Sequence, residues 1–165
     1  MRGNPAHRIR CPTASTEHEG DAMKLVLFLH LIFVAAWMSC VIVEGIFEHA
    51  IDRSPEQRAF ISKLHWSTDK YVEIPAFTIV LITGAILLAH RAPTPLLLTK
   101  VAFGTLAIAL NAVCVWIVIR RTRYAARNDY AAWERIDRLQ HKLGGVVAIS
   151  MLVALGIGGY LFAGG

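Results

Sequence analysis

Four long apolar runs dominate the sequence and leave few folds open to it. They occupy residues 25–47, 74–89, 96–119 and 143–163. A helix needs about 20 apolar residues to cross a bilayer. Only helices or closed barrels can span lipid, because every backbone polar group must find its partner within the protein. The sequence therefore predicts an all-α fold, an integral membrane bundle of four transmembrane helices.

The segments outside these runs define the rest of the domain organisation. Residues 1–22 are polar, contain proline and glycine, and lack apolar periodicity, so we expect a disordered N-terminal extension. Residues 23–165 then form a single four-helix transmembrane domain, since four spans leave no room for another. Residues 51–73 and 124–142 carry apolar residues at spacings of three and four, which predicts two amphipathic loops at the membrane surface.

The basic residues are distributed unevenly between the two sides of the predicted bundle. Eleven of the 17 Lys and Arg residues lie in the stretches that follow the first and third runs. Cytoplasmic loops carry an excess of Lys and Arg, so both amphipathic loops are predicted to be cytoplasmic and both termini to lie outside. The net charge of +5 is thus a signal of topology, and we expect no nucleic-acid partner.

The first run carries its ionisable residues on one side of the predicted helix. From His30, steps of 7, 14 and 18 residues lead to Trp37, Glu44 and Glu48. At about 100° per residue, these positions fall within roughly 40° of one line. Ionisable groups are costly in hydrocarbon, so this stripe is expected to face protein, a cofactor or water. The helix is therefore predicted to form the wall of a site.

Depth in the membrane divides the other polar residues into two sets. The outer end of the bundle should gather His30, His90 and Lys100. The inner end should gather Glu44, Glu48, His49, Glu73 and His141, with His65 on the adjoining loop. A site at the outer end with carboxylates toward the cytoplasm is the arrangement that these positions predict.

Histidine is the usual axial ligand of haem in helix bundles, which makes the buried stripe a candidate haem site. We expect His30 to bind the haem iron, with His90 and Trp37 as further cofactor-binding residues. Glu44 is then predicted to act as a catalytic proton carrier between this site and the cytoplasm.

Two other classes of function stay open for the same stripe. A copper-handling protein would draw on the soft ligands His30, Met38, Cys40 and Cys114. A cofactor-free accessory subunit would place the stripe against a larger membrane complex.

Individual residues also have purely structural alternatives. Lys100 lies near the start of its run, where a lysine can extend to the lipid headgroups. His90 lies at the end of a run and can be an interfacial residue. Glu44 can pair with a basic residue of a neighbouring span, such as Arg120 or Arg121.

Four motifs between residues 25 and 121 carry a family resemblance. They are HLIFVAAW in the first run, IFEHA after it, IPAFTIVLITG in the second run and LLLTKVAFG in the third. Together they resemble the HemJ-type protoporphyrinogen oxidases and, more loosely, the CopD-like copper-resistance membrane proteins. The resemblance implies a four-span protein of the bacterial inner membrane with periplasmic termini and bound haem b.

The resemblance also implies an activity and its residues. HemJ-type proteins oxidise protoporphyrinogen IX to protoporphyrin IX and pass electrons to the respiratory chain. His30 matches the histidine of the family's first span and Lys100 the lysine of its third, which implies an iron ligand and a catalytic residue. The implied partners are the lipid bilayer, a porphyrin, a quinone-linked electron acceptor, and further copies of the chain or a membrane complex.

Overall fold

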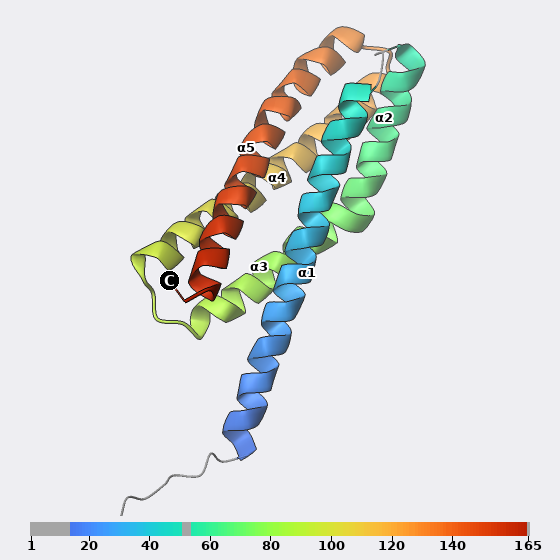
Figure 1. Cartoon of the computed structure of the whole chain (residues 1–165). Helices are drawn as coiled ribbons and strands as arrows, with labels where there is room; N and C mark the ends of the chain where they lie inside the picture. Colours follow the sequence, from blue (N-terminus) through green and yellow to red (C-terminus); the bar gives the residue numbers. More distant parts are fainter. Residues whose placement is uncertain (1–13, 51–53, 165) are drawn as a thin grey trace, which may run out of the picture.

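The computed structural model describes residues 14–50 and 54–164, except for the side chains of residues 14–17, and all of its regular elements are helices. They are α1 (Ala14–Ala50), α2 (Pro55–Thr68), η1 (Asp69–Glu73), α3 (Ile74–Ala89), α4 (Pro95–Ala126) and α5 (Tyr130–Phe162) (Figure 1). Four helical stretches are long and apolar enough to cross a membrane. The prediction of an all-α bundle of four transmembrane helices is confirmed.

The second span is longer than its apolar run. α2, η1 and α3 form one unbroken helical stretch, Pro55–Ala89. In η1, the N–H of Ile74 donates to the carbonyl of Asp69, five residues back. Such a π-helical turn holds one residue more than an α-helical turn. The amphipathic loop predicted for residues 51–73 is therefore, from residue 55 onward, a continuation of the second span, and Ser54 caps it; residues 51–53 lie outside the described ranges.

The last span is extended in the same way. α4 ends at Ala126, a short turn follows, and α5 begins at Tyr130 and runs without a break into the fourth apolar run. The second amphipathic loop is thus built of the end of one long helix and the start of the next. Both amphipathic segments are helical because their buried faces have partners within the bundle, α2 on α4 and α5 on α4.

Side-chain caps fix where the long helices begin. The hydroxyl of Thr94 accepts a hydrogen bond from the N–H of Leu97 at 3.2 Å, and Pro95 occupies the first turn of α4. The carboxylate of Asp129 accepts from the N–H of Ala132 at 3.1 Å and starts α5. Caps of this kind satisfy backbone donors that have no partner inside the helix.

α1 begins earlier than the apolar pattern indicates. Residues 14–22 are helical, so the prediction of disorder does not hold for them; residues 1–13 of the predicted extension lie outside the described part of the chain. Lys24 and Asp21 form an exposed ion pair at 2.9 Å on these first turns. Once a helix is nucleated, each added residue contributes a backbone hydrogen bond, so the helix extends beyond the membrane-spanning residues.

The helices pair in a pattern that separates the two ends of the molecule. α4 packs along α5, α1 packs on α3, and α2 packs on α4, whereas α3 and α4 touch little although a short turn joins them. The turn between α4 and α5 and the start of α2 lie at one end, which we call the loop end (Figure 1). The start of α1 and the end of α5 lie at the other, the terminal end.

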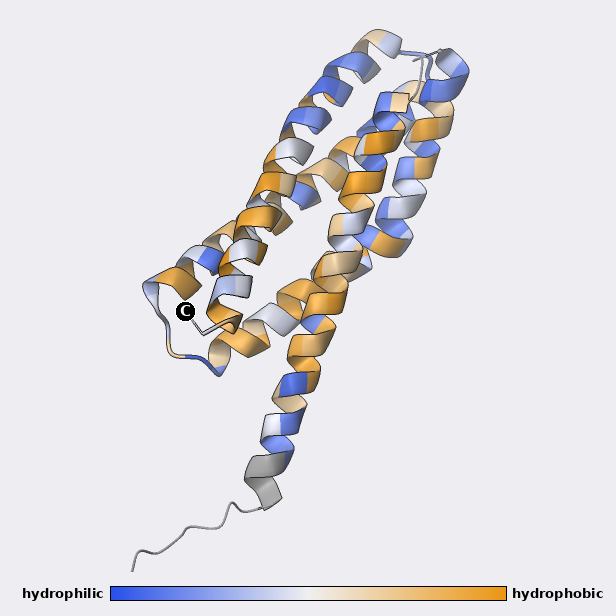
Figure 2. Ribbon diagram, in the orientation of Figure 1, coloured by the Kyte–Doolittle hydropathy of each residue, from blue (hydrophilic) through white to orange (hydrophobic). Residues whose placement is uncertain are grey.

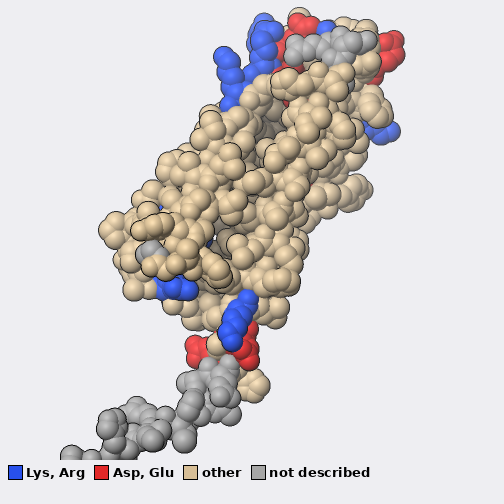
Figure 3. Space-filling model, in the orientation of Figure 1, with Lys and Arg blue, Asp and Glu red and all other residues tan. Residues whose placement is uncertain are grey.

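Apolar side chains form the centre of the bundle and its outer surface. The central cluster contains the buried residues Trp37, Ala76, Val80, Ala107, Val147 and Met151. Small residues at such positions allow membrane helices to approach closely. Apolar residues cover the middle of the helices, and Lys, Arg, Asp and Glu gather toward the two ends (Figures 2 and 3). This distribution is that of a multi-pass membrane protein with a lipid-facing belt.

The topology prediction concerns the sidedness of the two ends. Because the loop end carries most of the basic residues, it should face the cytoplasm, and both termini should be periplasmic. A periplasm-active reporter fused after Gly165 should be active. The same reporter inserted at Asn128, in the turn between α4 and α5, should be silent. The reverse pattern would contradict the orientation.

Candidate functional site

The polar stripe of α1 faces the interior of the bundle, as predicted. Trp37, Glu44 and Glu48 are 2%, 9% and 8% exposed, and His30 is half-buried. At the loop end the stripe meets α2, α4 and α5, and at the terminal end His30 meets α3. The stripe therefore contributes to two separate polar sites.

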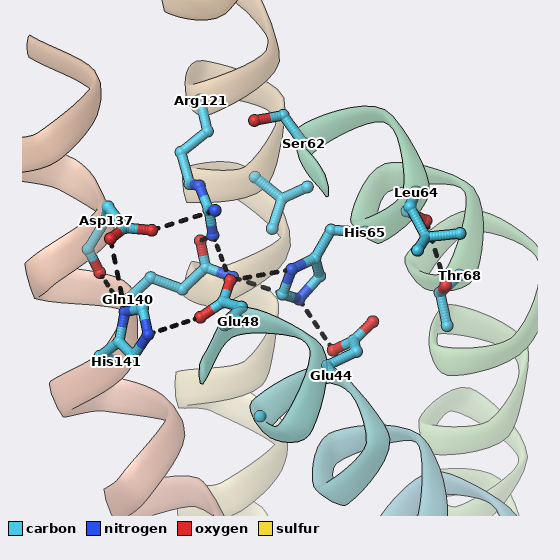
Figure 4. A network of polar contacts seen from close by, with 12 residues as sticks. Glu44, Glu48, Ser62, Leu64, His65, Thr68, Arg121, Asp137, Gln140 and His141 are labelled. Carbon is cyan, nitrogen blue, oxygen red and sulfur yellow. Dashed lines mark hydrogen bonds and ion pairs between the residues drawn. The ribbon is translucent and has the colours of Figure 1, made fainter. Parts of the chain in front are cut away.

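Glu48 is the point at which four helices meet (Figure 4). Its Oε1 accepts from the guanidinium of Arg121 on α4 and lies 3.1 Å from Nδ1 of His65 on α2. Its Oε2 lies 2.8 Å from Nε2 of His141 on α5. One carboxylate on α1 thus joins the other three long helices. The surrounding residues, which we call the polar network, are Glu44, Glu48, His65, Arg121, Asp137, Gln140 and His141.

Arg121 is the fully buried cation of the polar network. Its guanidinium binds Glu48 and lies 3.0 Å from Oδ1 of Asp137, and it donates to Oε1 of Gln140 at 2.8 Å. The ring of Trp133 lies 4.7 Å from its central carbon. A buried charge needs partners of this kind, because desolvation removes several kcal/mol of hydration. Arg121 and its two carboxylates are therefore a structural unit.

His65 connects the polar network to Glu44. Its Nδ1 faces Glu48, and its Nε2 lies 2.8 Å from Oε2 of Glu44. The side-chain nitrogen of Gln140 lies 3.3 Å from the same Nε2. Glu44 therefore pairs with a histidine, and the alternative in which it pairs with Arg120 or Arg121 is not what the structure shows.

A second group of acidic side chains lies next to Glu44, and we call Glu44, Asp69 and Glu73 the acidic cluster. Asp69 and Glu73 are 1% and 3% exposed. Each of these two carboxyl groups interacts electrostatically with the other and with Glu44. The thiol of Cys40 lies 4.0 Å from Oε1 of Glu44. Three carboxyl groups are thus buried together at the border of the apolar region.

His30 forms the polar site of the terminal end. Its Nδ1 lies 2.9 Å from the hydroxyl of Thr83 on α3. That hydroxyl donates its single proton to the carbonyl of Ile79 at 2.6 Å, so it accepts from His30. The imidazole therefore carries its proton on Nδ1, and Nε2 presents a lone pair. The ring lies against Gly84, where an added Cβ would approach Cε1 to 3.3 Å.

The other residues predicted for the outer site do not all join His30. The Lys100 side chain lies along Gly158 of α5, and its charge acts on the His30 imidazole. His90 is exposed and its Nδ1 turns back to the carbonyl of Ile86, within its own helix. Trp37 packs in the central apolar cluster, but its indole Nε1 is buried without a hydrogen-bond partner.

Three groups of side chains have the ligand spacing of a metal site. They are Cys40 with Glu44 and Glu73, Glu44 with His65 and Asp69, and Glu48 with Asp137 and His141. In each, the potential ligand atoms lie within 4.8 Å of one another. Within the ranges that the structure covers, neither His30 nor Cys114 joins such a group, so the soft ligands considered for copper are not gathered in one place.

Several residues of these sites were missed by sequence reasoning. Asp137 and Gln140 lie on the buried face of α5 together with Trp133, and Asp69 follows His65 by four residues on the second span. Their signal was present in the sequence as polar residues at helical spacing within amphipathic segments. It was missed because polar residues on an amphipathic helix were assigned to its solvent face.

Comparisons with known proteins identify no relatives, since no protein-family model, curated protein or solved structure matches this chain.

The structural role of Arg121 can be tested by substitution. Arg121→Ala leaves Glu48 and Asp137 buried without their cation, so it should lower the free energy of unfolding by about 3–5 kcal/mol. Arg120→Ala, a neighbour exposed over Trp116, should lower it by less than about 1 kcal/mol. Chemical unfolding of the detergent-solubilised proteins measures both. Equal effects of the two changes would contradict the assigned role.

Proposed function

We propose that the chain is a haem-b-binding membrane redox protein in which His30 binds the haem iron. The observation that carries the proposal is the fixed tautomer of His30. Thr83 accepts from Nδ1 and holds the ring from its α3 side. A histidine whose second nitrogen donates to a neighbouring group is the usual form of an iron or zinc ligand, because that bond fixes the ring and makes the free nitrogen more basic.

Three features around His30 support the proposal of a cofactor between the helix pairs. Glycine at position 84 lets the imidazole lie close to α3, because an added Cβ there would approach Cε1 to 3.3 Å. The unpartnered indole N–H of Trp37 lies two helical turns further along the same face of α1 and needs an acceptor. α3 and α4 make few contacts with each other at this level, so the bundle is less tightly closed here than at the loop end.

Haem b, when bound, would supply one-electron transfer. The chain's own residues would bind and orient the reactants. His30 would hold the group through Nε2, and Thr83 would keep the ring in place. Lys100, whose charge acts on the His30 imidazole, is a counter-charge for the carboxylates that porphyrins carry. Lys100 is thus proposed as the residue that positions an anionic substrate or cofactor edge.

The resemblance to HemJ-type proteins supports a porphyrinogen as the substrate class, with electrons passed on to the respiratory chain. A copper site at His30 has less support, because Cys40 and Cys114 do not join His30 in a ligand group among the described residues. The proton-carrier role of Glu44 stays a prediction.

His30→Ala tests the iron ligand. Removing the imidazole should abolish the reduced haem b absorption spectrum of the purified protein, while membrane insertion and helical content stay unchanged. His90→Ala, which removes an exposed histidine bonded only within its own helix, should keep the wild-type spectrum. An unaltered spectrum in the His30 variant would exclude this residue as the ligand.

Thr83 provides a second test that keeps the ligand itself. Thr83→Val has nearly the same shape but offers no acceptor to Nδ1, so haem affinity should fall by about 10–100-fold and the haem midpoint potential should shift. Thr83→Ser keeps the hydroxyl and should behave as wild type. Haem titration and redox potentiometry measure the effect. Identical behaviour of the valine and serine variants would show that the hydrogen bond has no role.

A further inference from the structure

We propose that the acidic cluster and His65 form a binding site for one divalent first-row transition-metal ion of the Zn²⁺, Mn²⁺ or Fe²⁺ class. The ligand triad is Glu44, His65 and Asp69, whose ligand atoms lie within 4.8 Å of one another. Glu73 and Cys40 lie beside the triad, because both join Glu44 in a second group with the same spacing. This site is separate from His30 and does not depend on haem.

The first argument is the unbalanced charge of the acidic cluster. The ion pairs of the polar network assign Arg121 to Glu48 and Asp137, and His141 to Glu48. His65 pairs with Glu48 and with Glu44, which leaves Asp69 and Glu73 as the unpaired members of the acidic cluster. Asp69 and Glu73 form no ion pair with any Lys, Arg or His in residues 18–50 and 54–164. One oxygen of Asp69 is buried without a hydrogen-bond partner. Carboxylates in such a place require protons or a cation, because an unpaired buried charge is strongly unfavourable.

The second argument is the hydrogen-bond pattern around His65. Nδ1 of His65 faces Oε1 of Glu48 at 3.1 Å, and its Nε2 pairs with Oε2 of Glu44 at 2.8 Å. The side-chain nitrogen of Gln140 lies 3.3 Å from the same Nε2. Two carboxylates therefore converge on one imidazole, and a divalent ion bound to Nε2 and Glu44 would take the place of the proton between them. Two ligand atoms of one Zn²⁺ lie about 3–3.5 Å apart, given bonds of about 2.1 Å.

The arrangement around Nδ1 supports the same conclusion. Metal-bound histidines commonly donate their other N–H to a carboxylate, which orients the ring. Glu48 occupies this position for His65 and is itself held by Arg121. The ring of His65 is thus fixed from the side opposite Glu44, as Figure 4 shows. The polar network acts as the support of the site.

A small cavity borders two of the three proposed ligands, Glu44 and His65. Its lining consists of Glu44, Phe47, Ile61, Leu64, His65 and Thr68. Its volume of about 10 Å³ is roughly that needed for a single water molecule. The cavity is therefore suited to a water or a dehydrated ion and excludes an organic cofactor. Carboxylate oxygens with one imidazole are ligands that Zn²⁺, Mn²⁺ and Fe²⁺ share.

Metal binding and proton transfer are competing uses of Glu44. A carboxylate oxygen bound to a divalent ion is not free to take up a proton. If protons alone balance the acidic cluster, the protein should bind no divalent ion at this place. The two roles are therefore distinguished by direct measurement of metal binding.

The experiment uses the full chain, purified in detergent without a polyhistidine tag and treated with EDTA. Equilibrium dialysis against Zn²⁺ should show one tightly bound ion per chain. Asp69→Asn keeps the shape of the side chain and should weaken binding at least tenfold. Glu56→Gln, an exposed carboxylate on α2, and His49→Ala, an exposed histidine near His141, should bind as wild type.

X-ray absorption of the Zn²⁺-loaded wild-type protein and of its His141→Ala variant, which removes the histidine of the group Glu48, Asp137 and His141, gives a second test even if Asp69→Asn fails to fold. Both proteins should show one imidazole together with oxygen ligands. The proposal is overturned if no stoichiometric ion binds, if the bound ion has no imidazole ligand in either protein, or if Asp69→Asn binds as tightly as wild type. Loss of binding in His49→Ala would show that the ion binds at the protein surface, and this result would also overturn the proposal.

Discussion

The cost of burying charge in a region without water determines the architecture of the loop end. Helices in lipid gain no hydrophobic energy by associating, so close packing and polar contacts determine which helices meet. Arg121 is buried on α4 and satisfied only when Glu48 of α1 and Asp137 of α5 are both in place. Glu48 in turn requires His65 of α2 and His141 of α5. The arrangement of four helices is thus specified by a few groups that have no acceptable alternative partner.

The terminal end is organised differently. Its helices meet through apolar side chains and small residues, and His30 with Thr83 is its main polar contact between helices. Because fewer obligatory contacts hold this end together, it can accommodate a reactant without disrupting the fold. The loop end, held by buried ion pairs, thus supports the terminal end, which has fewer polar contacts between its helices. This division is compatible with the redox function that we propose, since a cofactor would need fixed ligands and a substrate would need a way in.

The spans and the direction of the α1 stripe were predictable from the sequence, because long apolar runs and helical periodicity are local properties of the chain. The contact between His30 and Thr83 was not, although Thr83 and Gly84 stand in one of the motifs that carried the resemblance. Which partner a charged group takes depends on the depth and rotation of whole helices. Arg121 meets Glu48 instead of Glu44, one helical turn away.

The residues predicted to gather at the outer end of the bundle show the same limit of sequence analysis. His90 has the right depth to meet His30, yet it is bonded to its own helix, because a residue at the end of a helix finds the carbonyls of its last turn first. The sequence analysis placed both Asp69 and Glu73 in an amphipathic loop that ends where the second span begins. The structure makes that boundary a continuous helix.

The π-helical turn Asp69–Glu73 changes the direction in which the side chains of the second span point on its two sides. One extra residue rotates everything beyond it by about 100° relative to an uninterrupted α-helix. His65 of α2 and Thr83 of α3 both contact α1, at Glu44 and at His30, while the hydroxyl of Ser62 accepts from Trp133 of α5. In an uninterrupted α-helix the 18 residues from His65 to Thr83 would make about five full turns, so both side chains would point in the same direction. The added residue turns these directions about 100° apart, and the acidic residues of the turn lie between the two halves of the span.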